Sequence, residues 1–307
     1  MKDLMMLFGV TLAKRYTNRQ KRIFYSQLEP FLEKMGYTIK YQQLQKKLIR
    51  VKNILIGDIY KAQYVVLCPY DTPSRSLLPY KYYPFNSSKN LQQENKELLL
   101  RSLIYIGSCV VAYFVVNQFL MLTTILKIFV IVVLVCLLIF CYQLLMGIAN
   151  SVNFNRNSAS VALLIALAER TKKNTNICYI LLDKNVSSNA GLKLLTEDER
   201  IKNKIFIYLD CVSYGEELVC AHSQATSSEA KKIISFLSEV AVIDHVFEEE
   251  RLSETNLKYF PKLLHVCVGS IENRQFLVRN TRSKKDFKVD IHRLETLRKG
   301  LLKYLGS

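Results

Sequence analysis

Two carboxylates stand where apolar, strand-like runs of the sequence end. Asp71 follows the run "YVVLCPY", and Asp210 closes the run "KIFIYLD". Open α/β sheets bind ligands outside the carboxyl ends of their strands, so these side chains could ligate a metal or transfer a proton. A carboxylate at a strand end can instead cap a helix or accept backbone N–H groups. The pair therefore predicts a site at one edge of a sheet and leaves its chemistry open.

Nucleophilic thiols are the second candidate chemistry near these strand ends. Cys68 lies shortly before Asp71, and Cys211 follows Asp210 directly. A reactive thiolate needs a neighbouring histidine or a helix N-terminus, and the sequence shows neither beside these cysteines. The four histidines also lack the H-E-x-x-H spacing of a zinc site: His222, His245, His265 and His292. We therefore expect both thiols to be packed in the core.

Strands and helices alternate along the parts of the chain that must position these residues. An amphipathic helix over residues 17–35 ends at Gly36 and precedes three strand-like runs, "YTIKYQQ", "KNILIGDI" and "QYVVLCPYD". After residue 149, helical runs alternate with the strand-like runs "NICYILLD", "KIFIYLD" and "KLLHVCVGS", and a helical run closes the chain. This alternation predicts an α/β layer fold with a mostly parallel central sheet.

One apolar block interrupts this pattern. Residues 103–149 carry a single charged side chain, Lys127. A bilayer core needs about 20 apolar residues, so the block predicts two transmembrane helices, at 103–122 and 125–148, divided by the polar run "TTILK". A buried helix pair in a soluble protein is the alternative, but such helices are not this continuously apolar. Asn117 and Gln118 could hydrogen-bond to the second helix or to another transmembrane helix.

The charges that flank this hairpin predict its orientation. Lysines and arginines precede and follow it, whereas its turn offers only Lys127. The positive-inside rule therefore places the soluble domain and both termini in the cytoplasm. Residues 1–100 and 150–307 would form one domain that a hairpin at 101–149 interrupts. Residues 72–100, rich in Tyr, Pro, Ser and Asn, are predicted to be an irregular connector along the membrane interface.

Composition narrows the partners and the compartment. The net charge is +17 at pH 7, which favours anionic lipid, acidic proteins or nucleic acid as partners. No zinc finger, helix-turn-helix or aromatic RNA-binding motif is present, so nucleic acid is not an expected partner. The eight cysteines form no C-x-x-C pair, which is typical of buried reduced thiols in a cytosolic domain. The short apolar stretch within Met1–Lys14 predicts a packed or amphipathic helix rather than a cleaved signal.

The order of several short motifs carries a family resemblance. The runs "KMGYTIKYQ", "KNILIGDI", "VVLCPYDT", "NFNRNSASVALLIALAE", "CYILLDKNVSSNAGLKLL", "IFIYLDCVSYG" and "RNTRSKKDFKVD" follow one another along the chain. This order resembles the two-zinc aminopeptidases, whose relatives include glutaminyl cyclases, glutamate carboxypeptidases and the transferrin receptor. In that family the corresponding segments contain Gly-Tyr, Asn-Val-Ile-Ala, His-x-Asp, Gly-Ala-Asp-Asp-Asn-Ala-Ser-Gly, Glu-Glu before Gly-Leu, a strand-end aspartate and His-Thr-x-x-Asp. The resemblance covers nearly the whole chain outside the hairpin and implies an aminopeptidase-like three-layer α/β/α fold.

The resemblance also implies a two-zinc site whose ligands can be compared one by one. Of six expected groups the chain keeps two, Asp71 and Asp210. The other positions hold Pro69 for the first histidine, Asn155 for the bridging aspartate, Asn185 and Val186 for the Glu-Glu pair of base and ligand, and Asn280 for the late histidine. Proline and valine offer no donor atom, and a carboxamide cannot act as a general base. Arg156 and Lys184 would add positive charge that opposes a bound cation.

These replacements predict a catalytically inactive cleft without a zinc cofactor. The predicted function is that of a membrane-anchored pseudo-peptidase that binds or scaffolds a peptide or another membrane protein. The cleft would be lined by Asp71, Asn155, Arg156, Lys184, Asn185 and Asp210. The transferrin receptor is an analogy for exchanging catalysis for binding. The rival prediction is an active membrane-bound metallo-aminopeptidase with an atypical zinc site, and a third is a basic domain that binds anionic lipid.

Overall fold

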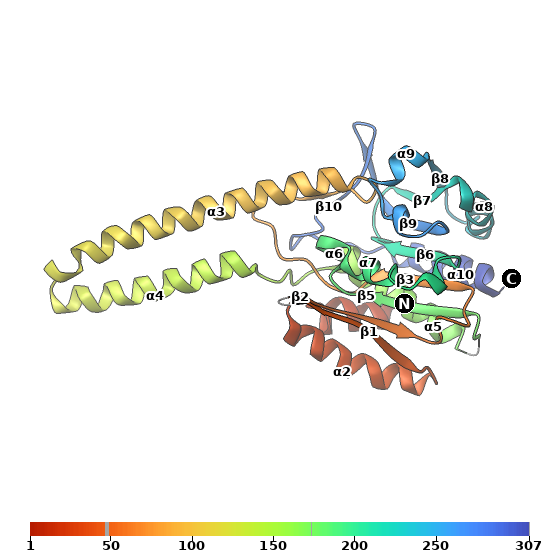
Figure 1. Ribbon diagram of the computed structural model, residues 1–307, viewed down its shortest axis with the longest axis horizontal. Coiled ribbons are helices and arrows are strands. Elements are labelled where there is room, and N and C mark those ends of the chain that lie inside the picture. The colour runs from red at the N-terminus through yellow and green to blue at the C-terminus, as the bar shows by residue number, and fades with distance from the viewer. Residues whose placement is uncertain (47–48, 173, 307) are drawn as a thin grey trace.

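The computed structural model describes residues 1–46, 49–172 and 174–306, and a sheet lies at its centre (Figure 1). Within these residues ten strands follow the order β1-β2-β5-β3-β6-β9-β10-β4, with β7 on β9 and β8 on β7. The four central strands β5, β3, β6 and β9 are parallel, whereas β1, β2, β4 and β10 pair antiparallel toward the edges. The predicted α/β fold with a mostly parallel central sheet is confirmed. The strands are β1 (Ile39–Lys46), β2 (Ile49–Ile56), β3 (Tyr64–Pro69), β4 (Lys81–Tyr82), β5 (Ile177–Leu182), β6 (Ile205–Asp210), β7 (Glu217–Ser223), β8 (Val242–Phe247), β9 (Leu263–Glu272) and β10 (Gln275–Arg279).

Helices cover both faces of this sheet, and each face has its own hydrophobic core. Along β3, Val66 and Cys68 pack into one core while Val65 and Leu67 pack into the other, because successive strand residues point to opposite faces. The first core is closed by α2 (Asn18–Lys34), α5 (Ala159–Arg170), α8 (Ser227–Phe236) and α10 (Ile291–Gly306). The second core is closed mainly by α7 (Ala190–Leu195) and by irregular segments. The short helices α6 (Asn185–Ser188) and α9 (Glu249–Leu252) lie in loops.

The first residues of the chain are packed against the domain. They form α1 (Lys2–Met6) and a π-helical turn, η1 (Leu7–Thr11), and Met5 and Phe8 are buried. The predicted packed first helix is therefore confirmed. Arg15 follows as a fully buried guanidinium that donates to the carbonyl oxygens of Tyr70 (2.6 Å) and Phe8 (2.9 Å). These bonds fix the N-terminal segment beside the end of β3.

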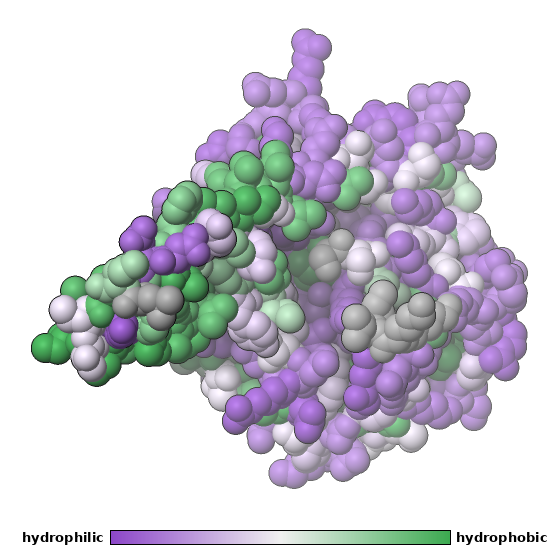
Figure 2. All heavy atoms as spheres, turned by 60° about the vertical axis from the view of Figure 1, so that its left-hand side comes forward, coloured by the Kyte–Doolittle hydropathy of each residue, from purple (hydrophilic) through white to green (hydrophobic). Residues whose placement is uncertain are grey.

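Two long apolar helices project from the domain as a hairpin (Figure 1). They are α3 (Ser87–Gln118) and α4 (Thr124–Met146), joined through a short 3-10 turn, η2 (Phe119–Met121). Both are long and apolar enough to cross a membrane. Figure 2 shows hydrophobic side chains over this hairpin and hydrophilic ones over most of the visible domain.

The predicted connector at 72–100 is partly wrong, because α3 already begins at Ser87. Its N-cap is Asn86, whose side-chain oxygen accepts the N–H of Lys89 at 2.9 Å. At 1.5 Å per residue this helix is about 48 Å long, well beyond the ~30 Å of a bilayer core. The first turns of α3 therefore belong to the domain.

Glu97 and Arg101 fasten these first turns to the domain and to α4. Glu97 is buried and accepts hydrogen bonds from Ser76 Oγ (2.9 Å) and the Leu77 N–H (2.8 Å). Arg101 forms an ion pair with Glu97 (2.9 Å) and donates to the carbonyl of Leu144 near the end of α4 (3.0 Å). One buried carboxylate thus joins both roots of the hairpin to the loop that leaves β3.

Candidate functional site

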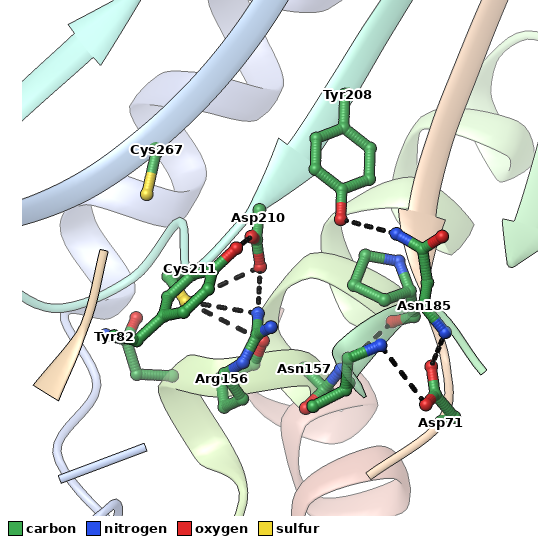
Figure 3. A network of polar contacts seen from close by, with 12 residues as sticks. Asp71, Tyr82, Arg156, Asn157, Asn185, Tyr208, Asp210, Cys211 and Cys267 are labelled. Atoms are coloured by element: carbon green, nitrogen blue, oxygen red, sulfur yellow. Dashed lines mark hydrogen bonds and ion pairs between the residues drawn. The ribbon is translucent and has the colours of Figure 1, made fainter. Parts of the chain in front are cut away.

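The two carboxylates singled out in the sequence lie at the ends of adjacent parallel strands, β3 and β6 (Figure 3). Asp210 is the last residue of β6 and is fully buried, and Asp71 lies just beyond Pro69, the last residue of β3. A polar network links the two regions. It runs through Asn185, whose side-chain amide donates to the hydroxyl of Tyr208 at 2.9 Å. The structure therefore brings both predicted positions to one edge of the sheet.

Asp210 forms a buried ion pair with Arg156. The Arg156 Nη1 atom contacts Oδ1 of Asp210, and the two side chains are 3% and 0% exposed. The hydroxyl of Tyr82 donates to the other carboxylate oxygen, Oδ2, at 2.6 Å. The guanidinium also lies over the Tyr82 ring, with its carbon 4.0 Å from the ring centre. Both oxygens of Asp210 are therefore already engaged by donors of the protein.

A buried aspartate that the sequence-based prediction omitted, Asp286, positions Arg156. Arg156 lies in a π-helical turn, η3 (Phe154–Ser158), immediately before α5. The N–H groups of Asn155 and Arg156 donate to the two carboxylate oxygens of Asp286, each at 3.1 Å. Burial raises the pKa of Asp286 from 3.8 to about 8, although these two hydrogen bonds act in the opposite direction. Asp286 lies in the segment that resembles His-Thr-x-x-Asp, and the aspartate of that motif could have identified Asp286 from the sequence.

Asn155 faces away from this ion pair. Its side-chain oxygen accepts from the N–H of Ser213 (3.0 Å) and of Tyr214 (2.9 Å). The family resemblance assigned the bridging aspartate to Asn155, whereas the side chain of the next residue, Arg156, contacts Asp210. Asn280 is exposed and lines a separate pocket of about 280 Å³ together with Asn155 and Asp286.

Asp71 binds backbone rather than side chains. Its carboxylate oxygens accept the N–H groups of Asn185 (3.0 Å) and Val186 (3.3 Å). Burial raises the pKa of Asp71, while the nearby charge of Lys21 lowers it. The side-chain oxygen of Asn185 also accepts the N–H of Leu192 (3.2 Å), so Asn185 orders the turn after β5. Asp71 and Asn185 together hold that turn against the end of β3.

Lys184 precedes this turn in a left-handed conformation, with φ of 46°. It lines a cavity of about 660 Å³ that also contains Asp71, Lys21 and, from the hairpin, Leu98 and Leu145. The cleft beside Asp71 therefore opens at the root of the two apolar helices.

Burial disfavours the candidate nucleophiles. It raises the pKa of the Cys68 and Cys211 thiols, which keeps both in the weakly nucleophilic protonated form near neutral pH. His265 is fully buried, and burial lowers the pKa of its imidazole from 6.5 to about 4. Neither ring nitrogen of His265 has a hydrogen-bond partner among the described residues, and Nε2 lies 3.9 Å from Oδ2 of Asp210.

Asn117 and Gln118 lie in the hairpin, and their predicted contacts with the second helix or with another transmembrane helix stay a prediction. Both side chains are exposed near its tip, and neither donates or accepts a hydrogen bond to α4 in the described structure. Tyr82, in contrast, was missed by sequence reasoning. It lies in the two-residue strand β4 within a tyrosine-rich segment, where no pattern distinguishes it from its neighbours.

Comparison with known proteins identifies the architecture. No protein-family model matches the chain, and no curated protein matches its sequence. The structure is similar to a Bacteroides thetaiotaomicron glutaminyl cyclase, with a TM-score of 0.56 and 12% identity, covering 99% of this chain and 94% of that one. It is also similar to a Macrostomum lignano glutaminyl cyclase (TM-score 0.54, 10% identity, 99% and 88% covered) and to the Legionella pneumophila LapA aminopeptidase (TM-score 0.55, 10% identity, 99% and 67% covered). The chain has the glutaminyl cyclase and aminopeptidase fold.

The residues at the site of this aminopeptidase-like domain do not fit the two-zinc centre that the resemblance implied. The oxygens of Asp210 are taken by Arg156 and Tyr82, and those of Asp71 by two backbone N–H groups. Within the described ranges, no three or more His, Cys, Asp and Glu side chains are grouped to hold a metal ion. Zinc in proteins takes His, Cys or carboxylate ligands, and Pro69 and Val186 supply none of these.

Proposed function

We propose that the chain is a membrane-anchored, non-hydrolytic member of the aminopeptidase-like fold that binds a peptide or another membrane protein. The observation that carries the proposal is the ion pair between Arg156 and Asp210. A guanidinium of the protein lies against the strand-end carboxylate that the resemblance assigns to a metal. Arginine keeps its positive charge at every physiological pH, so this charge balance is permanent.

A metal at this carboxylate would face a large electrostatic cost. Two unit charges 4 Å apart interact by about 4 kcal/mol at an effective dielectric constant of 20, so a divalent ion beside Arg156 would be opposed by about twice that. Displacing Arg156 would also leave a buried guanidinium without its partner. The retained aspartates therefore support a structural role, in which Asp210 neutralises Arg156 and Asp71 orders the turn at Asn185.

Membrane anchoring is supported by the two apolar helices. Each is long and apolar enough to cross a membrane, and each is largely uncovered by the rest of the chain. The domain is built from residues that precede the hairpin and residues that follow it, so both must lie on the same side of the membrane. Two spans meet this requirement, because they return the chain to the side where it started. Basic residues around both roots support, by the positive-inside rule, a domain and termini on the cytoplasmic side.

The binding role is supported by the cavity beside Asp71. Its volume of about 660 Å³ lies in the size range of small-molecule and peptide side-chain pockets. It is lined by the basic Lys184 and by apolar residues of the hairpin root, Leu98 and Leu145. A partner in the same membrane can reach such a cavity, since it opens beside the two helices.

Zinc content and turnover test the loss of hydrolysis. We expect the full chain, purified in mild detergent, to hold far less than one zinc per molecule. We also expect no release of product from aminoacyl anilides and no cyclisation of glutaminyl peptides, with the Legionella aminopeptidase as positive control for the first assay. Stoichiometric zinc would overturn the proposal. So would turnover that Asp71→Ala abolishes and the exposed-carboxylate variant Asp3→Ala retains, because that result would indicate an active metallo-aminopeptidase.

Site-specific photo-crosslinking tests the binding role. A photoreactive residue at Lys184 should form adducts with a peptide or membrane protein in intact cells. The same residue at Lys231, which is exposed on α8, should not. Equal adducts from both positions would contradict a partner in the cleft.

A further inference from the structure

A second pocket beside the hairpin root carries an excess of positive charge. It has a volume of about 420 Å³ and is lined by Lys21, Arg22, Arg50 and Lys52, with Asp183 as its one carboxylate. Asp183 is already saturated: it forms an ion pair with Lys21 and accepts the N–H groups of Lys52 (3.0 Å) and Lys184 (2.8 Å). Lys21 is thereby neutralised, and the charges of the other three cations remain.

None of those three cations forms an ion pair within the described residues, although the charge of Glu29 acts on Lys52. Neither Arg22 nor Arg50 forms an ion pair with a described residue, and the Lys52 ammonium lies instead over two aromatic rings. Its nitrogen is 3.5 Å from the centre of the Tyr41 ring and 4.4 Å from that of Tyr25. Burial lowers the pKa of Lys52, the charge of Glu29 raises it, and the charge of Arg50 adds a smaller lowering. Gathering like charges around a pocket costs free energy that a bound anion would offset.

The position of the pocket identifies the source of such an anion. It shares Asn18 and Lys21 with the larger cavity that Leu98 and Leu145 of the hairpin line, so the two spaces adjoin. The hydroxyl of Tyr16, at the start of this segment, donates to the carbonyl of Met146 at the end of α4 (2.7 Å). Figure 2 shows hydrophilic side chains around a hollow beside the base of the apolar hairpin. The pocket therefore lies where the domain would meet lipid headgroups.

We propose that this pocket binds the phosphate of an anionic phospholipid headgroup, with Arg22, Arg50 and Lys52 as its cationic ligands. The assignment rests on the proposed placement of the hairpin in a membrane. Guanidinium groups suit phosphate because their planar N–H forks match two phosphate oxygens at once. The adjoining cavity is lined mainly by polar residues and reaches Leu98 and Leu145 of the hairpin, against which the acyl part of the lipid would pack. A zwitterionic headgroup fits less well, since its terminal cation would meet the same positive charges.

Calorimetric titration of the full chain in a neutral detergent tests the proposal. The probes are dihexanoyl phosphatidylglycerol, dihexanoyl phosphatidylcholine and sn-glycerol 3-phosphate. We expect phosphatidylglycerol to bind at least tenfold more tightly than either of the others. Each cation near an anionic membrane contributes about 1 kcal/mol, so the Arg50→Gln/Lys52→Gln variant should weaken binding about thirtyfold and Arg22→Gln about fivefold.

The matched control removes the same net charge far from the hairpin. Lys231→Gln/Lys303→Gln alters two exposed lysines on α8 and α10 and should leave phosphatidylglycerol binding unchanged. Equal binding of the two lipids, or equal loss in the site and control variants, would overturn the proposal. Binding of glycerol 3-phosphate as tight as that of the lipid would overturn the lipid as the source in favour of a soluble phosphate compound. If Arg50→Gln/Lys52→Gln does not fold, the exposed Arg22→Gln variant decides the outcome. Zinc content and turnover do not enter this measurement, so its failure is distinguishable from failure of the proposed function.

Discussion

Replacing Arg156 by methionine should destabilise the domain strongly, because it leaves the buried carboxylate of Asp210 without its charge partner. The two side chains are 3% and 0% exposed, so water cannot replace the guanidinium at little cost. Removing one partner of a buried pair costs about 3–5 kcal/mol. The hydroxyl of Tyr82 remains on Oδ2, which favours the lower part of that range. For a chain of this size about 2 °C of melting temperature corresponds to 1 kcal/mol, so we expect Arg156→Met to lower it by about 6–8 °C.

A double-mutant cycle separates the charge from the packing. Asp210→Asn in the Arg156→Met background removes the unpaired charge and should recover about half of the lost stability. Thermal unfolding of the full chain in detergent, followed by circular dichroism, gives the melting temperatures. Lys202→Met is the control, because it removes an ion pair with Glu199 whose side chains are 41% and 74% exposed. Such exposed pairs contribute at most about 1 kcal/mol.

An Arg156→Met variant whose melting temperature falls no further than that of Lys202→Met would contradict a strongly stabilising buried ion pair. A double variant less stable than Arg156→Met alone would also contradict it, since the charge of Asp210 would then not be the source of the cost.

Three further predictions concern other buried polar groups. Burial raises the folded pKa of Asp286 to about 8, so its contribution to stability is present below about pH 4 and is lost as the pH rises to 8. The variant Asp286→Asn should therefore gain stability relative to the unaltered chain over that pH interval. Melting temperatures of the two proteins that differ by a constant amount across the interval would contradict this. Burial lowers the folded pKa of His265 to about 4, so its contribution to stability is present above pH 6.5 and is lost as the pH falls toward 4. In thermal unfolding between pH 6.5 and 4, His265→Phe should remove that loss of roughly 3 kcal/mol. The same decrease of melting temperature with falling pH in both proteins would count against it. Glu97→Ala should speed amide hydrogen exchange of residues 76–78 at least tenfold, because Glu97 accepts their hydrogen bonds. The control Glu249→Ala, at an exposed glutamate, should leave these exchange rates unchanged. Equal exchange rates in the two variants would show that Glu97 does not fasten the hairpin.

The layer architecture could be predicted because each strand and helix is locally consistent with the fold. The apolar run before Asp210 and the helix-like pattern after Asn155 identify their elements without tertiary information. The start of α3 was predicted too late, because its first turns are polar and their partners lie elsewhere in the chain. No sequence pattern marks the partners of Glu97 and Arg101, which bind the loop at Ser76 and the end of α4.

The details of the site depended on which of two adjacent side chains faces the carboxylate. Asn155 and Arg156 follow each other in a π-helical turn, where successive side chains point in different directions around the helix axis. The sequence pattern could not tell which of these two side chains reaches Asp210, because the contacts of Asp286 that hold this turn come from a distant part of the chain. Tyr82 could not be predicted, since its hydrogen bond joins residues 128 positions apart.

The site and the hairpin are connected without a flexible linker. Thr72, one residue beyond Asp71, accepts the Arg15 N–H on its hydroxyl oxygen (2.9 Å), and its own N–H donates to the Arg15 carbonyl (3.3 Å). Tyr16 then binds Met146 at the end of α4 (2.7 Å). Because the turn at Asn185 is held by Asp71, a ligand that displaces this turn must also strain the contacts that lead to the hairpin root. The cleft beside Asp71 and the root of the hairpin are thus joined by direct hydrogen bonds through Arg15, Tyr16 and Thr72.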